Sequence, residues 1–210
     1  MGTDPAVVTP DAEGLLPEEV ADELLQRWAE PHRHYHGMSH LIDGLAALET
    51  LGGSRLERMA FWFHDAVHSN STPADEDASA ELVADLLVGH ELPADIAEIQ
   101  RLVLLTAGHR TEPDDPPGQR VCDADLSALG ADPATYRRNV EGIRAELPKL
   151  SEAEWELGRS RFLTQFLERE CFFATDTGRQ LWEASARVNV QNELDNLVPR
   201  TAWTTSLPLS

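Results

Sequence analysis

The chain has 210 residues, with 37 acidic and 17 basic side chains and a formal net charge of −20. This length suits a single domain with a substantial core. So much negative charge repels phosphate backbones, which argues against a nucleic-acid binder that relies on basic patches. A small phosphorylated substrate remains compatible with the charge if a metal ion supplies a local positive field.

The sequence carries no sign of export or of a membrane span. Cys122 and Cys171 are its two cysteines, too few for a disulfide framework or a four-sulfur zinc site, which indicates a reducing compartment. The first residues lack a basic segment followed by an apolar one, and no window approaches roughly 18 uninterrupted apolar residues. We therefore expect a cytoplasmic protein without nucleic-acid or membrane partners.

Apolar residues recur at helical spacing along most of the chain. No convincing alternation typical of strands is present, so we predict an all-α, single-domain helical bundle of about eight helices over residues 17–200. Loose tails are expected at 1–16 and 201–210, and a proline-rich loop at 110–120. Helices are predicted over residues 17–30, 39–53, 56–65, 72–86, 94–109, 121–130, 132–140, 151–166 and about 177–196.

Several helix starts carry capping signals. Ser39 is a possible N-cap, and Thr72 followed by Pro73 has the order of a cap and a first-turn proline. Asp132 precedes a proline in the same way. Ser151 and Glu154 have capping-box spacing.

Histidines are concentrated in one part of the chain: six of the eight fall between His32 and His68. His36 and His40 are four apart, so that in a helical stretch both point the same way. His64 and Asp65 end the apolar run FWFHDAVH, where an uncompensated carboxylate would cost several kcal/mol. A bound cation removes that penalty.

Two further acids, Asp123 and Asp125, lie between apolar residues in VCDADLSALG. Imidazole and carboxylate ligands without thiolate suit one or two divalent ions such as Mn, Fe, Co, Ni, Zn or Mg. Either acid could be a ligand, and Asp123 could instead cap a helix.

A histidine, then an adjacent His-Asp, then a distant aspartate, all on helices, resembles the HD superfamily of metal-dependent phosphohydrolases. YHGMSH (35–40) is similar to the YHNxxH signature of its cyclic-nucleotide phosphodiesterase branch, and ADLSAL (124–129) resembles the ADLS segment of that branch. With TAGH (106–109) and ARVNVQNEL (186–194), the chain also resembles a small bacterial group of HD proteins described as predicted phosphohydrolases.

The resemblance implies a metal site and a proton donor. The implied metal ligands are His40, His64, Asp65 and Asp125, with Asp65 also able to bridge to a second ion. His36 is the implied proton donor to the leaving group, although a metal-ligand or orienting role for it stays open. Gly37 replaces the signature asparagine and the region of the nucleotide pocket has no room here, so cyclic-nucleotide specificity is not carried over.

We therefore predict a metal-dependent phosphohydrolase that cleaves a small phosphate ester, such as a nucleotide, with a metal-activated water. Arg33 and His109 are expected to contact the phosphate. His68 is either a loop residue or a ligand of a second ion. The alternatives are a di-iron HD-type oxygenase and a non-catalytic, metal-stabilised sensor or binding module.

Overall fold

The computed structural model describes residue 12 and residues 14–197, and within them the chain is helical, with one isolated β-bridge between Val88 and Glu91. The all-α prediction is thus confirmed for this part of the chain. The expected tail at 201–210 lies outside the described residues. No helix among those described has the length and apolar character needed to cross a membrane.

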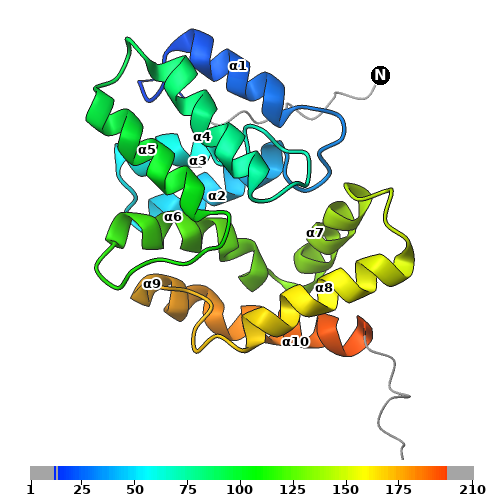
Figure 1. The fold of residues 1–210 in the computed structure, drawn as a ribbon. Helices are drawn as coiled ribbons and strands as arrows, with labels where there is room; N and C mark the ends of the chain where they lie inside the picture. Colours follow the sequence, from blue (N-terminus) through cyan, green and yellow to red (C-terminus); the bar gives the residue numbers. More distant parts are fainter. Residues whose placement is uncertain (1–11, 13, 198–210) are drawn as a thin grey trace, which may run out of the picture.

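The helices follow one another through turns and several longer loops (Figure 1). Their bounds are α1 (Glu18–Trp28), α2 (Met38–Thr50), α3 (Arg55–Phe63), α4 (Ala74–Leu87), α5 (Pro93–Leu105), α6 (Pro116–Leu126), the 3₁₀ turn η1 (Ser127–Gly130), α7 (Pro133–Ala145), α8 (Glu152–Leu167), α9 (Asp176–Gly178), the π-helical turn η2 (Arg179–Glu183) and α10 (Ala184–Leu197).

Two of the predicted caps are present. The Asp132 carboxylate accepts hydrogen bonds from the backbone N–H groups of Ala134 and Thr135 at the start of α7. Ser151 and Glu154 form the reciprocal capping box that starts α8. These caps satisfy backbone donors that have no partner within the helix.

Other predicted helix ends were wrong. Helix α2 begins at Met38 after an extended Gly37, so Ser39 is not its N-cap. The Thr72 hydroxyl donates to Glu76 instead of capping the backbone of α4. Helix α6 begins inside the predicted loop at Pro116, because the Asp115 side chain accepts from the Gly118 N–H.

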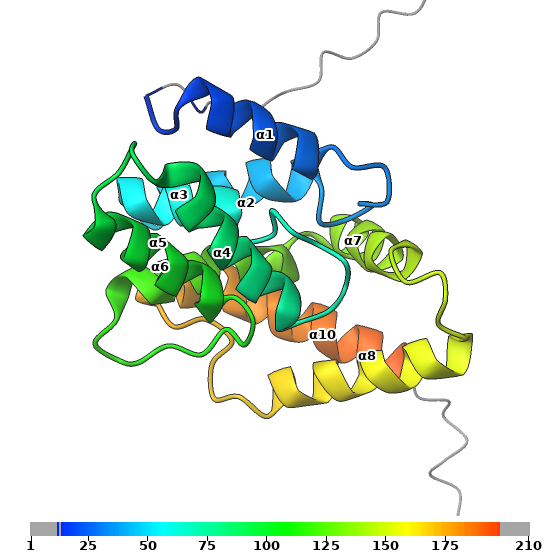
Figure 2. The same cartoon turned by 45° about the horizontal axis from the view of Figure 1, so that its top comes forward.

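The apolar side chains form two clusters. The larger lies among α1 to α6 and includes Leu16, which the sequence had placed in the loose N-terminal tail. The smaller joins the end of α6, α8, the connection before α9 and α10 through residues such as Leu163, Phe173 and Val190. Helices α8 and α10 lie side by side in both views (Figures 1 and 2), and Trp182 packs against both clusters.

Helices α2 and α3 approach each other closely at Gly44. A methyl group at Gly44 would overlap the ring of Phe61, which is completely buried. Gly44 lies one turn after His40 on α2, and Phe61 lies one turn before His64. The absence of a side chain at Gly44 therefore sets the distance between the two helices that carry these histidines.

A buried ion pair joins α3 to α6. The Arg120 guanidinium donates from Nε and Nη2 to the two carboxylate oxygens of Glu57, at 2.7 and 2.8 Å. Glu57 is only 2% exposed and also accepts a hydrogen bond from the Ser54 hydroxyl. This pairing fixes α6, which carries Asp125, against the first turn of α3.

We expect Gly44→Ala to destabilise the protein. Overpacking of this kind costs about 1–3 kcal/mol, and the gain in helix propensity from glycine to alanine is at most about 1 kcal/mol. Gly158→Ala on the exposed face of α8, where an added methyl meets nothing within 4 Å, is the matched control and should raise stability slightly. Urea unfolding of both variants measures the difference; an equal change in both would contradict the close α2–α3 contact.

Candidate metal centre

The four residues predicted as metal ligands lie together. The Nε2 atoms of His40 and His64 are 3.2 Å apart. Asp125 Oδ1 lies 3.0 Å from His40 Nε2 and 3.5 Å from His64 Nε2. Asp65 Oδ2 lies 3.7 and 3.2 Å from the same two nitrogens. The residues come from α2, from the turn after α3 and from α6, so tertiary packing alone brings them together.

The two facing nitrogens point at one buried position. His64 Nδ1 lies 2.8 Å from the carbonyl oxygen of Phe61, to which it donates, so a neutral His64 ring has its lone pair on Nε2. With a second imidazole nitrogen 3.2 Å away and both side chains almost fully buried, either His40 donates a hydrogen from its Nε2 to this lone pair or a cation lies between the rings. Two imidazoles and two carboxylates around one point are the ligands of a divalent ion.

The charges of the site are strongly coupled. Burial disfavours ionisation of Asp65 and Asp125, but the neighbouring His64 outweighs it and holds the pKa of each carboxyl below its ordinary value. Burial likewise opposes a charged His64, yet Asp65 and Asp125 raise its pKa well above the usual value. The two carboxylates thus make this buried position favourable for a cation.

His109 contacts a carboxylate of the site directly. Its Nε2 lies 2.6 Å from Asp125 Oδ2, and its backbone φ of 49° is in the left-handed region. That conformation is uncommon outside glycine and is maintained only by the surrounding structure. His109 therefore fixes the orientation of Asp125 from the turn after α5; a contact to substrate phosphate, as expected from the sequence, stays a prediction.

Arg33 lies behind the site instead of facing substrate. Its side chain is fully buried, and its guanidinium donates to the backbone carbonyls of His36, Asp65 and Ala66 at 2.7 to 3.1 Å. We expected Arg33 to contact the phosphate of a substrate. In the structure its guanidinium donors are instead used by backbone carbonyl oxygens. Arg33 ties the loop before α2 to the His64-Asp65 turn.

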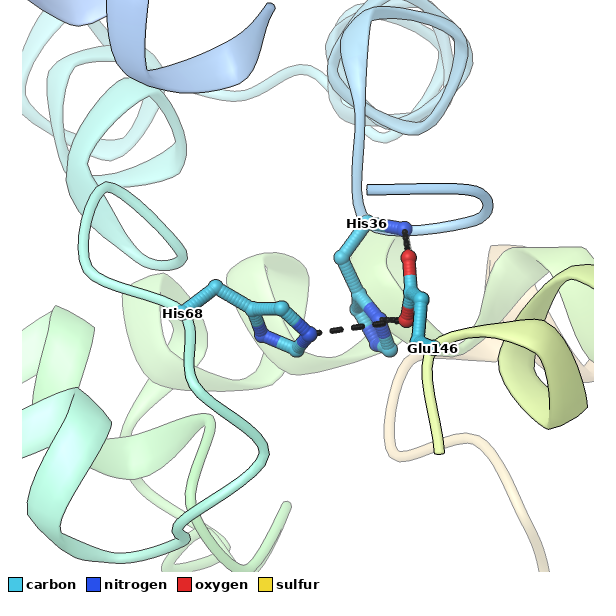
Figure 3. Close-up of side chains that lie close together, drawn as sticks. All are labelled: His36, His68 and Glu146. Carbon is cyan, nitrogen blue, oxygen red and sulfur yellow. Dashed lines mark hydrogen bonds and ion pairs between the residues drawn. The ribbon is translucent and has the colours of Figure 1, made fainter. Parts of the chain in front are cut away.

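A second group of polar side chains lies beside the first. His36 Nδ1 is 2.7 Å from Glu146 Oε2, and His68 Nε2 is 3.4 Å from the same oxygen (Figure 3). The His36 and His40 ring centres are 5.7 Å apart, so the two groups are neighbours. Burial opposes a charged His36, but the hydrogen bond to Glu146 and the charge of Asp65 raise its pKa.

Glu146 is the important residue that the sequence did not single out. It follows α7, and its Oε1 accepts the backbone N–H groups of His34, Tyr35 and His36 at 2.7 to 2.9 Å. A glutamate at the carboxyl end of a helix opposes the helix dipole. The unfavourable position of Glu146, two residues before Pro148, was the one feature of the sequence that indicated a special role for it, and the indication is weak.

Asp123, on α6, holds the connection that precedes α9. Its carboxylate is 1% exposed and accepts hydrogen bonds from Ala174 N, Thr175 N and the Thr175 hydroxyl, each at 2.7 Å. Asp125, two residues later, points to the histidines. Of the two acids in VCDADLSALG, Asp125 therefore belongs to the candidate metal centre.

Both groups open into one cavity of about 850 Å³. Its polar wall includes Asp65, Asp125 and His109 as well as His36 and His68. Its apolar wall is formed by side chains from α6, η1, α7 and α8, among them Leu126, Leu129, Ile143, Leu147 and Phe162. Arg159 also lines the cavity, and its Nε donates to Glu193 at 2.7 Å.

In comparisons with protein-family models, curated proteins and solved structures, no match to this chain was found. The proposed function therefore depends on the geometry of the described residues.

We expect substitutions of the two aspartates of α6, Asp123 and Asp125, to have different effects. We expect Asp125→Asn to reduce bound divalent metal at the centre, because it removes a charged oxygen beside both imidazoles. Asp123→Asn should instead lower thermal stability, by about 1–3 kcal/mol since it weakens buried hydrogen bonds to a charged group, and leave metal content unchanged. Metal analysis and thermal unfolding of both variants measure this, and equal metal loss would contradict the assignment.

Proposed function

We propose that the protein is a metal-dependent phosphohydrolase of the HD type, acting on a small phosphate ester. The observation that supports it most is the convergence of His40, His64, Asp65 and Asp125, with the two Nε2 atoms 3.2 Å apart, beside a cavity that takes a small molecule. The order of these residues in the chain is the order of the motif that the sequence resembles.

The residues of the centre fit a divalent ion, and each has a defined part in holding it. His64 is oriented by the Phe61 carbonyl, and Asp125 by His109. A bound divalent ion supplies positive charge that polarises a phosphoryl oxygen and lowers the pKa of a coordinated water. In the overall reaction, water adds to phosphorus, the ester P–O bond breaks and the leaving oxygen takes up a proton.

His36 is positioned to supply that proton. It lines the cavity, and its Nδ1 is held by Glu146 at 2.7 Å. Because Nδ1 donates its hydrogen to Glu146, the ring carries a second hydrogen on Nε2 in its protonated form, and that hydrogen is available to a leaving oxygen. The raised pKa of His36, caused by Glu146 and Asp65 in opposition to burial, favours the form that carries this proton.

The cavity favours an ester with an apolar organic part. Leu129, Ile143 and Phe162 lie on the wall that the metal centre does not occupy. A base or another ring could pack against these side chains while its phosphate faces the histidines. A nucleoside phosphate is one member of this class.

The first activity test compares two aspartates. We expect the purified protein with Mn²⁺ or Co²⁺ to hydrolyse members of a phosphate-ester panel, and Asp65→Asn to lose about 10²-fold or more in kcat/KM, as for loss of one preorganised electrostatic group. Asp85→Asn, on the exposed face of α4, is the matched control and should keep full activity. Initial rates with and without chelator measure both effects.

Two other outcomes would replace the proposal. Iron in the purified protein together with oxygen consumption would identify the oxygenase alternative. Loss of thermal stability in His64→Ala, with no turnover of any ester by the wild type, would identify a metal-stabilised binding module.

The role of His36 is tested with two leaving groups. A 4-nitrophenyl ester leaves as a stable anion and needs little proton donation, whereas an alkyl ester leaves as an alkoxide. We therefore expect His36→Gln to lower kcat on the alkyl ester by about 10²-fold or more and to affect the 4-nitrophenyl ester much less. Equal losses on both esters would show that His36 is not the proton donor; His90→Gln on the exposed surface is the control.

A further inference from the structure

We infer that His36, His68 and Glu146 form a second site for a divalent cation, next to the first. One ring nitrogen of each histidine and one carboxylate oxygen of Glu146 lie within 4.8 Å of one another (Figure 3). They come from three separate places: the loop before α2, the loop after the His64-Asp65 turn, and the end of α7. The ring centres of the two histidines are 4.2 Å apart.

Glu146 presents one fixed oxygen to this position. Its side chain has no solvent exposure, and its Oε1 is used by three backbone N–H groups of residues 34–36. Oε2 is left to face the two rings, at 2.7 Å from His36 Nδ1 and 3.4 Å from His68 Nε2. Oε2 is therefore the oxygen of Glu146 that can act as a ligand, in place of its hydrogen bond to His36.

His68 provides an independent indication of a ligand. Its side chain is only 8% exposed, and its Nε2 is buried without a hydrogen-bond partner among the described residues. The 3.4 Å that separate this nitrogen from Glu146 Oε2 exceed an ordinary N–H···O distance. Buried polar nitrogens are almost always satisfied, and a cation between His68 and Glu146 would satisfy this one.

The ligand set defines the class of ion. Two imidazoles and one carboxylate are the protein ligands of a type of catalytic zinc site, in which further positions stay open for water or substrate. Nitrogen and oxygen ligands without sulfur also accept Co²⁺ and Mn²⁺. The site therefore suits a borderline divalent transition-metal ion.

The negative charge of the cavity wall is a reason to expect a second cation. Four carboxylates line the cavity, from Asp65, Asp75, Glu76 and Asp125, whereas its one lining guanidinium, Arg159, is paired with Glu193. A phosphate ester entering this cavity meets net negative charge, which a second cation would reduce. This part in catalysis rests on the proposed hydrolase function, whereas the binding itself does not.

The second ion and proton donation by His36 exclude each other. The cation would take Nδ1, the atom that faces Glu146, and would replace its hydrogen. The ring would then be neutral and its Nε2 hydrogen too weakly acidic for transfer to a leaving oxygen, so that an ion at this site makes His36 a ligand instead of the proton donor.

Metal counting tests the inference. The full-length protein is stripped with chelator and dialysed against Co²⁺, and bound cobalt is measured by elemental analysis. We expect two ions per chain in the wild type, one in His68→Gln, one in Glu146→Gln and one in Asp125→Asn. Glu141→Gln, on the exposed face of the same helix α7, is the matched control and should keep two.

One ion in the wild type, or two in His68→Gln, would overturn the inference. Should Glu146→Gln fail to fold in circular dichroism, because Glu146 also holds the 34–36 loop, His68→Gln decides alone. The proposed function fails separately: a protein with two ions that hydrolyses no ester refutes the hydrolase and leaves the second site intact, whereas an active hydrolase with one ion refutes only the second site.

Discussion

The close approach of the His40 and His64 Nε2 atoms is the interaction on which the centre of this fold depends. Two nitrogen lone pairs directed at one buried point would repel each other unless a hydrogen on one of them or a cation lies between them. Asp65 and Asp125 supply the negative charge that makes a cation stable there, and their own ionised forms are stabilised in return by His64. His64 and the two aspartates thus each lower the free-energy cost of burying the charge of the others.

The surrounding contacts hold this arrangement in place. Trp28 packs its ring near both histidines and donates from Nε1 to the Trp62 carbonyl at 2.9 Å, which joins α1 to α3. Arg33 fixes the backbone carbonyls of Asp65 and Ala66. Because these residues are buried and hydrogen-bonded, they hold the four predicted ligands in a fixed arrangement.

The parts of the fold that could be predicted from the sequence are those that depend on local chemistry. Helical periodicity, the Asp132 cap and the Ser151–Glu154 capping box each act within a few residues, and all were recognised correctly. The helix starts at Met38 and Pro116 were missed. At Met38 the extended backbone of Gly37 precedes the helix, and the nearby Ser39 looked like the cap. At Pro116 the Asp115 side chain caps the helix, but the surrounding prolines and glycine indicated a loop. The four predicted ligands were chosen through the order of their motif, and their side chains lie together in the structure. Glu146, in contrast, contacts His36 across more than 100 residues of sequence and leaves almost no local signal.

Glu146 also explains why the loop before α2 belongs to the site. A loop that carries three consecutive free N–H groups would be an unstable support for a functional histidine, but one buried carboxylate oxygen binds all three. The same carboxylate directs its second oxygen at His36 and His68. The end of α7 therefore controls both the backbone and the ring of His36. Since α7 contacts η1, which directly follows α6 and Asp125, the two polar groups of the cavity are held by one continuous set of packed elements.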